Sequence, residues 1–194
     1  MVQRVKPAGR AALDARVTEL ALAAAEGDRP ALGEFIRLTQ ADVWRFIAHL
    51  AGQQQADDLT QDTYLRAMDS LPSFEGRAPA RAWLLTVARR VVADQVRHEM
   101  ARPQTPRGPE WMASHDAASQ DSSGTVELTS LIAMLGTERR EAFVLTQLLG
   151  FTYEQAAEVC GVRIGTIRSR VARARETLVA ACSDEDLRSE LRAS

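Results

Sequence analysis

The chain has 194 residues, of which 45% are hydrophobic, 26% charged and 5% aromatic, which suits one large or two small globular domains. Ala, Leu, Arg, Glu and Gln abound while β-branched runs are scarce, so we expect an all-α fold. The formal net charge is −2, no apolar stretch approaches membrane-spanning length, and the N-terminus lacks a signal peptide's apolar segment; we therefore exclude a membrane partner and expect a cytosolic protein.

A first helical domain is predicted over residues 17–98, after a disordered extension over residues 1–16. Between Leu32 and Leu50, apolar side chains recur at the three- and four-residue spacing of an amphipathic helix. That spacing indicates one helix face turned towards a core. Gly52 and the glutamines after it predict the end of this helix.

The next predicted helix carries acids on its surface. Asp57 or Asp58 can cap it, because negative charge complements a helix N-terminus. The side chains expected on its outer face are Asp58, Gln61, Asp62 and Arg66. Taken alone, this pattern favours a solvated face.

A loop over residues 71–80 leads to a helix with two different sides. Leu84, Ala88, Val91 and Val92 form its apolar side. The opposite side carries Trp83, Thr86, Arg90, Asp94 and Arg97. A tryptophan beside arginines is typical of a surface that stacks bases and holds phosphates of single-stranded nucleic acid, although Trp83 could equally fill the core.

Residues 99–125 are rich in Pro, Arg, Gly and Ser and show no periodicity, which predicts a linker. Its first part is basic through Arg102 and Arg107. Its second part is acidic through Glu110, Asp116 and Asp121.

A second helical domain is predicted over residues 126–182, followed by a polar tail over residues 183–194 that we expect to fray. Thr152 and Gln155 form a capping-box pattern, which opens a short helix that ends at Cys160. Gly161 then provides a C-cap glycine before a second helix. This order is the layout of a DNA-binding helix-turn-helix.

The second helix of this unit has a core side and a basic side. At about 100° per residue, the shared apolar side consists of Ile164, Ile167, Val171, Ala174 and Leu178. Thr166, Ser169, Arg170 and Arg173 lie opposite and suit base edges, while Arg163, Arg168 and Arg175 suit phosphates. The alternative is an arginine-rich surface helix with intrahelical pairing, but Glu176 is the only acid among these arginines.

These pieces together resemble the bacterial RNA polymerase sigma factors of the extracytoplasmic-function (ECF) group, which are of the sigma-70 type. The matching segments are 57–67, 74, 82–90, 94, 97, 140–143, 149–157, 161–162, 165–170 and 173–175. Arg90 stands where that family often has Asn. The resemblance implies two small all-α domains, sigma domain 2 and sigma domain 4, joined by a flexible linker.

The resemblance also implies partners and site residues. The acidic helix that starts at Asp57 would bind the clamp helices of the largest subunit of core RNA polymerase. Its contact residues would be Asp57, Asp58, Gln61, Asp62 and Arg66. The −10 element would be opened and read by Phe74, Arg77, Trp83, Thr86, Arg90 and Arg97, and the −35 element by the basic side described above. The second domain would also touch the flap of the second-largest subunit, and an anti-sigma factor is a further partner that the resemblance allows. The acidic half of the linker would imitate RNA in the exit path, or serve only as a tether.

Two other classes of function compete with this interpretation. A dimeric helix-turn-helix regulator would bind a palindrome without polymerase. An enzyme has little support, because His49, His98 and His115 lie in unrelated contexts and no nucleophile, metal-ligand or phosphate-loop pattern appears. Cys160 and Cys182 have no metal-ligand spacing, and Cys160 fits a buried helix position. We expect no catalytic residue, no metal and no cofactor.

Overall fold

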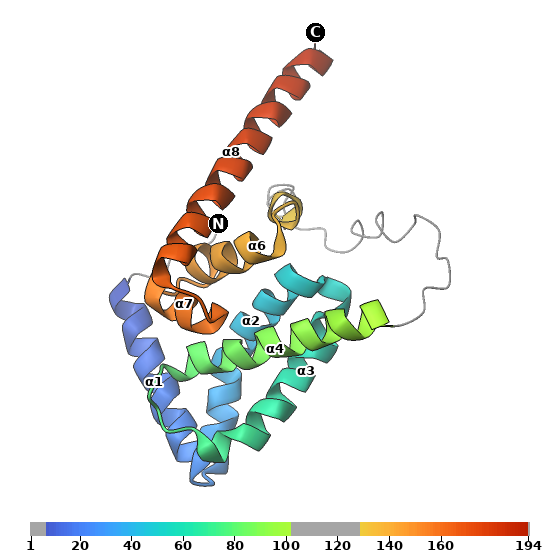
Figure 1. Ribbon diagram of the computed structural model, residues 1–194. Helices are drawn as coiled ribbons and strands as arrows, with labels where there is room; N and C mark the ends of the chain where they lie inside the picture. The colour runs from blue at the N-terminus through green and yellow to red at the C-terminus, as the bar shows by residue number, and fades with distance from the viewer. Residues whose placement is uncertain (1–6, 102–128, 194) are drawn as a thin grey trace.

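The computed structural model describes residues 7–101 and 129–193, and within these ranges every regular element is a helix (Figure 1). The all-α prediction is confirmed for this part of the chain. The predicted linker over residues 99–125 lies outside the described residues from position 102 onward, and so do its charged residues Arg102, Arg107, Glu110, Asp116 and Asp121; its first three residues, 99–101, are instead the end of a helix. No helix among the described residues is long and apolar enough to cross a membrane.

The first domain contains α1 (Pro7–Ala25), α2 (Arg29–Ala51), α3 (Gln53–Ser70), the short 3-10 helix η1 (Leu71–Ser73) and α4 (Ala80–Ala101). The prediction of a disordered extension over residues 1–16 is wrong from Pro7 onward, because α1 begins there. Within the segment predicted as disordered, Leu13 packs against the core and Asp14 pairs with the buried Arg81, and these tertiary contacts stabilise the start of the helix.

Asp28 caps the start of α2 by accepting a hydrogen bond from the Ala31 backbone N–H at 3.0 Å. At the other end of α2, the junction with α3 is tighter than predicted. Gly52 has φ 91°, which turns the chain sharply enough for α3 to begin at the next residue. The prediction that Asp57 or Asp58 caps this helix is therefore wrong, since both lie inside α3.

The core of the first domain follows the predicted apolar spacing. Phe35, Val43, Phe46 and Ile47 of α2 are buried, and so is the predicted apolar side of α4, namely Leu84, Ala88, Val91 and Val92. Leu59 and Tyr64 of α3 are buried as well, whereas Met68 is exposed.

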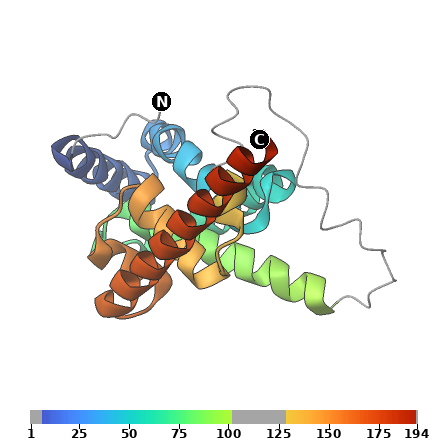
Figure 2. The ribbon, with the colours of Figure 1, turned by 90° about the horizontal axis from the view of Figure 1, so that it is seen from above.

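The second domain begins, within the described residues, with a helical segment over 129–133. It continues with α6 (Thr137–Phe143), the π-helical turn η3 (Val144–Leu148), α7 (Tyr153–Cys160) and α8 (Ile164–Ala193). Residues 183–193 of the predicted tail form the end of α8, which rises beyond the other helices in Figure 1 and points towards the viewer in the view from above of Figure 2.

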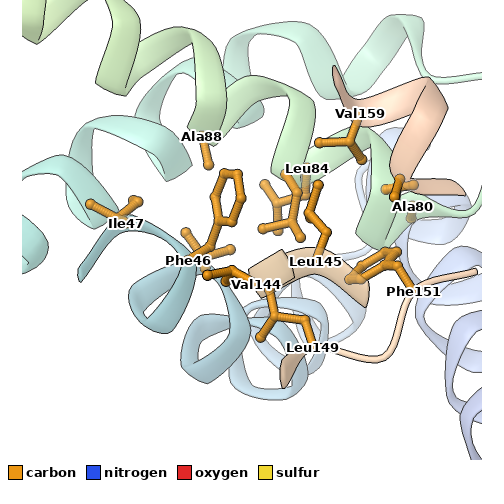
Figure 3. Close-up of a cluster of buried hydrophobic side chains, with 14 of the residues drawn as sticks. Phe46, Ile47, Ala80, Leu84, Ala88, Val144, Leu145, Leu149, Phe151 and Val159 are labelled. Atoms are coloured by element: carbon orange, nitrogen blue, oxygen red, sulfur yellow. The ribbon is translucent and has the colours of Figure 1, made fainter. Parts of the chain in front are cut away.

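The two domains share one buried apolar cluster (Figure 3). The first domain contributes Phe46, Leu84 and Ala88, and the second contributes Val144, Leu145, Leu149, Phe151 and Val159. In this arrangement α7 lies against α4 and α6 lies against α2. The sequence had predicted the two domains but not this contact between them.

Candidate nucleic-acid interface

The helix-turn-helix is built as its local sequence predicts. Gln155 N–H donates to Thr152 Oγ1 at 3.2 Å, and Thr152 N–H donates to Gln155 Oε1 at 2.9 Å, so both halves of the capping box form. Gly161 ends α7 in the left-handed conformation with φ 65°. In the turn that leads into α8, the Gly161 and Val162 N–H groups donate to carbonyls of α7, and Val162 packs against the core.

The predicted core side of α8 is confirmed. Ile167, Val171 and Ala174 are fully buried, and Ile164 and Leu178 are partly buried. This burial fixes the rotation of α8 about its axis, so the opposite face must point outwards. The predicted DNA-contacting side chains that are exposed are Arg163, Arg168, Ser169, Arg173 and Arg175.

Arg170 and Thr166 lie closer to the body of the domain than predicted. The Arg170 side chain is only 14% exposed, and its Nη2 lies 2.7 Å from Oε2 of Glu138 on α6. Thr166 is partly buried, and its carbonyl oxygen accepts a hydrogen bond from Ser169 Oγ at 2.9 Å. Arg175 Nη2 donates to Gln147 Oε1 at 2.7 Å, which holds that guanidinium at the edge of the face.

In the first domain, two of the predicted −10 residues, Phe74 and Trp83, form an aromatic pair. The rings of Phe74 and Trp83 have centroids 5.0 Å apart at an interplanar angle of 42°, and both side chains are partly buried. Trp83 therefore packs on the core with one part and reaches the surface with another. Thr86 Oγ1 donates to the Ala82 carbonyl at 3.0 Å, so its hydroxyl proton is used within the helix.

The cations predicted for the −10 surface differ in their surroundings. Arg90 is exposed on α4, and Arg77 forms an exposed ion pair with Glu75. Arg97 is 76% exposed in its side chain and pairs with Asp94 one turn earlier on α4.

The acidic face of α3 is partly engaged in contacts of its own. Asp57, Asp58 and Gln61 are all exposed, and Asp57 Oδ1 also accepts a hydrogen bond from Trp44 Nε1 at 2.7 Å. Arg66 lies 2.9 Å from Asp62 and also pairs with Asp94 across the α3–α4 contact. Hydrogen bonds from Arg66 and then from Arg97 lower the pKa of Asp94, which keeps this carboxylate charged.

Sequence reasoning missed the polar contacts that accompany the shared core. Arg81 is buried in α4 with 2% of its side chain exposed, and its guanidinium lies 2.5 Å from Asp14 Oδ1 and 2.6 Å from Asp42 Oδ2. Asp14 also accepts a hydrogen bond from Gln155 Nε2 of α7 at 3.1 Å. One signal was available, since Arg81 lies three residues before Leu84 and seven before Ala88, on their buried side.

A second missed contact joins α4 to α6. Arg89 Nε donates to Glu141 Oε1 at 3.0 Å, and the Glu141 side chain is only 7% exposed. Cys160 is buried beside this pair, and burial together with the Glu141 charge raises the pKa of its thiol to about 12. Among the described residues no group of three or more His, Cys, Asp and Glu side chains is placed to hold a metal ion.

Two family models divide the chain between them. The model of sigma-70 region 2 matches residues 35–102, and the model of sigma-70 region 4 matches residues 125–178. A two-domain helical protein with both regions is a transcription initiation factor of the sigma-70 type. This pair of matches decides against the dimeric regulator.

Comparison with individual proteins narrows the class. The chain is similar to the ECF RNA polymerase sigma factor SigC of Mycobacterium tuberculosis, with 53% identity over 176 residues that cover 90% of this chain and 95% of the relative. The chain belongs to the ECF family of RNA polymerase sigma factors. It is thus a factor that binds core RNA polymerase and promoter DNA and directs transcription initiation.

Two solved structures are similar to most of the chain. One is CnrH in complex with the cytosolic domain of CnrY, with a TM-score of 0.68, 25% identity, and coverage of 87% of this chain and 98% of that chain. The other is the sigma factor RpoE in complex with the anti-sigma factor NepR from Bartonella quintana, with a TM-score of 0.63, 32% identity, and coverage of 76% and 93%.

Proposed function

We propose that the outward face of α8 reads the −35 element. The observation that supports this assignment most strongly is the division of the helix into a buried side, with Ile167, Val171 and Ala174, and an exposed side that carries Ser169 and Arg173. Hydroxyl and guanidinium groups on that side can reach base edges, and Arg163, Arg168 and Arg175 can hold the phosphates on either side. Arg170 and Thr166 then act at the margin of the face, because both are partly buried.

The −10 element would be held by the surface around Phe74 and Trp83. A base stacked on an aromatic ring gains about 1–3 kcal/mol, and the exposed Arg90 and Arg97 supply charge for the phosphates. Arg77, on the loop before α4, extends this positive surface. Thr86 contributes an acceptor oxygen, since its proton is already donated within α4.

Core polymerase would bind the acidic face of α3, where Asp58 and Gln61 are exposed and Asp57, Asp62 and Arg66 lie in polar contacts at the surface. A face with three carboxylates within two helical turns suits a cationic partner surface. The second domain would touch the flap of the second-largest subunit, as the family resemblance implies.

Three further properties follow from the same assignment. The factor supplies recognition and opening of DNA and no catalytic chemistry of its own. It works in the cytoplasm, where polymerase and promoters are. An anti-sigma factor is a candidate partner, because the similar structure of RpoE is a complex with the anti-sigma factor NepR.

The test is run-off transcription with core polymerase on a promoter library. Arg173→Ala should cost about 1–3 kcal/mol at one −35 position and relax the preference there, whereas Arg175→Ala should weaken all promoters evenly. Arg45→Ala, an exposed arginine of α2, is the matched control. Unchanged −35 preference in the Arg173 variant would remove that residue from the reading surface.

A further inference from the structure

Asp94 stands between the proposed polymerase-binding face and the proposed −10 surface. Its two carboxylate oxygens serve different partners, because Oδ2 accepts from Arg66 Nη1 of α3 and Oδ1 accepts from Arg97 Nη2 of α4. Arg66 in turn holds Asp62, with Nη2 at 2.9 Å and Nε at 3.3 Å from its two carboxylate oxygens. The four side chains form a continuous row of alternating charge at the surface.

The row has two ends of opposite kind. Asp62, at one end, belongs to the acidic face that would bind polymerase. Arg97, at the other end, belongs to the basic surface that would bind DNA. Arg66 and Asp94 each form ion pairs with two neighbours, so a closer ion pair with one neighbour weakens the ion pair with the other.

We propose that Asp94 couples polymerase binding to capture of the −10 strand by masking Arg97 in the free factor and releasing it in the holoenzyme. This inference rests on the proposed roles of Asp62 and Arg97. A cationic group of polymerase that binds Asp62 competes with Arg66 for that carboxylate. Arg66 then pairs more fully with Asp94, Asp94 withdraws from Arg97, and the Arg97 guanidinium becomes available to a DNA phosphate.

The geometry allows this exchange at low cost. All four side chains are at least 38% exposed, so water can replace each lost partner during the exchange. Exposed ion pairs contribute little individually, and we expect a bias of about two- to fivefold in DNA binding rather than an all-or-none switch. Such a bias lowers the occupancy of promoters by factors that carry no polymerase.

The test uses the full chain and a fluorescein-labelled oligo(dT), which reports phosphate contact without base preference. Asp94→Asn keeps the shape of the side chain and removes the charge that holds Arg97. It should raise oligo(dT) affinity about two- to fivefold and make the salt dependence steeper by about 0.7 in log–log slope. Asp69→Asn is the matched control, since Asp69 is exposed on α3 and makes no ion pair among the described residues.

Asp62→Asn tests the coupling itself. It takes the Asp62 carboxylate away from Arg66, as a cationic group of polymerase bound to Asp62 would. It should raise oligo(dT) affinity in the free factor, and should add little in the Asp94→Asn background. The Asp94→Asn effect should also vanish when Arg97 is Ala. Equal gains from Asp94→Asn and Asp69→Asn would reduce the effect to net charge and overturn the proposal.

The outcomes separate this proposal from the proposed function. If Arg97→Ala leaves oligo(dT) affinity unchanged in the Asp94→Asn background, where Arg97 is unmasked, Arg97 does not contact DNA and its assignment to the −10 surface is wrong. If Arg97→Ala weakens binding while Asp94→Asn changes nothing, the surface stands and the coupling is wrong. Additive gains from Asp62→Asn and Asp94→Asn would likewise show that the row does not transmit the exchange.

Discussion

The guanidinium carbon of Arg81 lies 4.6 Å from the ring centroid of Phe151, which places a buried cation of the first domain against an aromatic ring of the second. Two carboxylates balance that charge, Asp14 from α1 and Asp42 from α2. Cation–π contacts gain strength when water is excluded. Arg81 therefore joins three helices of the first domain to the segment that leads into the helix-turn-helix.

The first prediction concerns this buried charge. Arg81→Ala should lower the free energy of unfolding by about 3–5 kcal/mol, because it leaves two largely buried carboxylates facing each other without a cation. Arg81→Lys should be intermediate, since one ammonium cannot pair with both carboxylates as a guanidinium fork does. Urea denaturation followed by circular dichroism measures both.

The matched control is Arg45→Ala, which removes an exposed arginine 3.7 Å from the same Asp42. We expect it to cost less than about 1 kcal/mol. Similar losses for Arg45→Ala and Arg81→Ala would show that the buried network contributes no more than a surface ion pair.

The second prediction separates helix capping from domain contact at Gln155. Its Oε1 accepts the Thr152 N–H and its Nε2 donates to Asp14 Oδ2. Gln155→Glu keeps an acceptor for the cap but places a negative charge beside Asp14. We expect α7 to remain folded while the second domain loosens from the first, seen as a larger radius of gyration in small-angle X-ray scattering with unchanged helicity.

Asp14→Asn in the Gln155→Glu background removes that repulsion and should restore the compact radius in part. Thr152→Ala should show the reverse pattern, a loss of about 1 kcal/mol from the cap with the domains still in contact. A Gln155→Glu protein with the wild-type radius would show that the Asp14 contact does not help to hold the domains together.

The success of the sequence predictions depended on the range of the contacts. The helix-turn-helix and the two sides of α4 and α8 were predicted because their capping residues, glycine and apolar spacing act within a few residues. Arg81 and Asp14 are separated by 67 residues, and Gln155 and Asp14 by 141, so no local pattern pairs them. The alanine-rich start of α1 was missed for the same reason, since its partners lie elsewhere in the chain.

The third prediction is a pH dependence at the contact between α2 and α6. Burial, and then the charge of Arg140, lower the pKa of His49 from its usual value of 6.5. Arg140 also donates to the His49 carbonyl at 3.3 Å. The folded state thus binds fewer protons here than the unfolded state, so this stability is complete above pH 6.5 and is lost as the pH falls through the folded pKa.

We expect the free energy of unfolding to fall between about pH 6.5 and 5.5, above the range in which carboxylates titrate. His49→Gln should flatten the curve in this window. His98→Gln, at an exposed position on α4, is the matched control. A slope that survives His49→Gln would assign the titration to another group.

The last prediction uses the two thiols as reporters of the domain contact. Cys182 is exposed, whereas Cys160 is buried and its pKa is raised from 9.0 to about 12 by burial and by Glu141. Because the thiolate is the reactive form, the raised pKa makes Cys160 much less reactive than an ordinary thiol at neutral pH, before any shielding is counted. Iodoacetamide should therefore modify Cys182 first, as peptide mass spectrometry would show.

Arg89→Ala removes the partner of Glu141 at the same contact and should speed alkylation of Cys160 as the domains separate. Arg90→Ala, one residue further along α4 and exposed, should not. Equal alkylation rates for Cys160 and Cys182 in the wild-type protein would mean that the second domain does not stay against the first in solution.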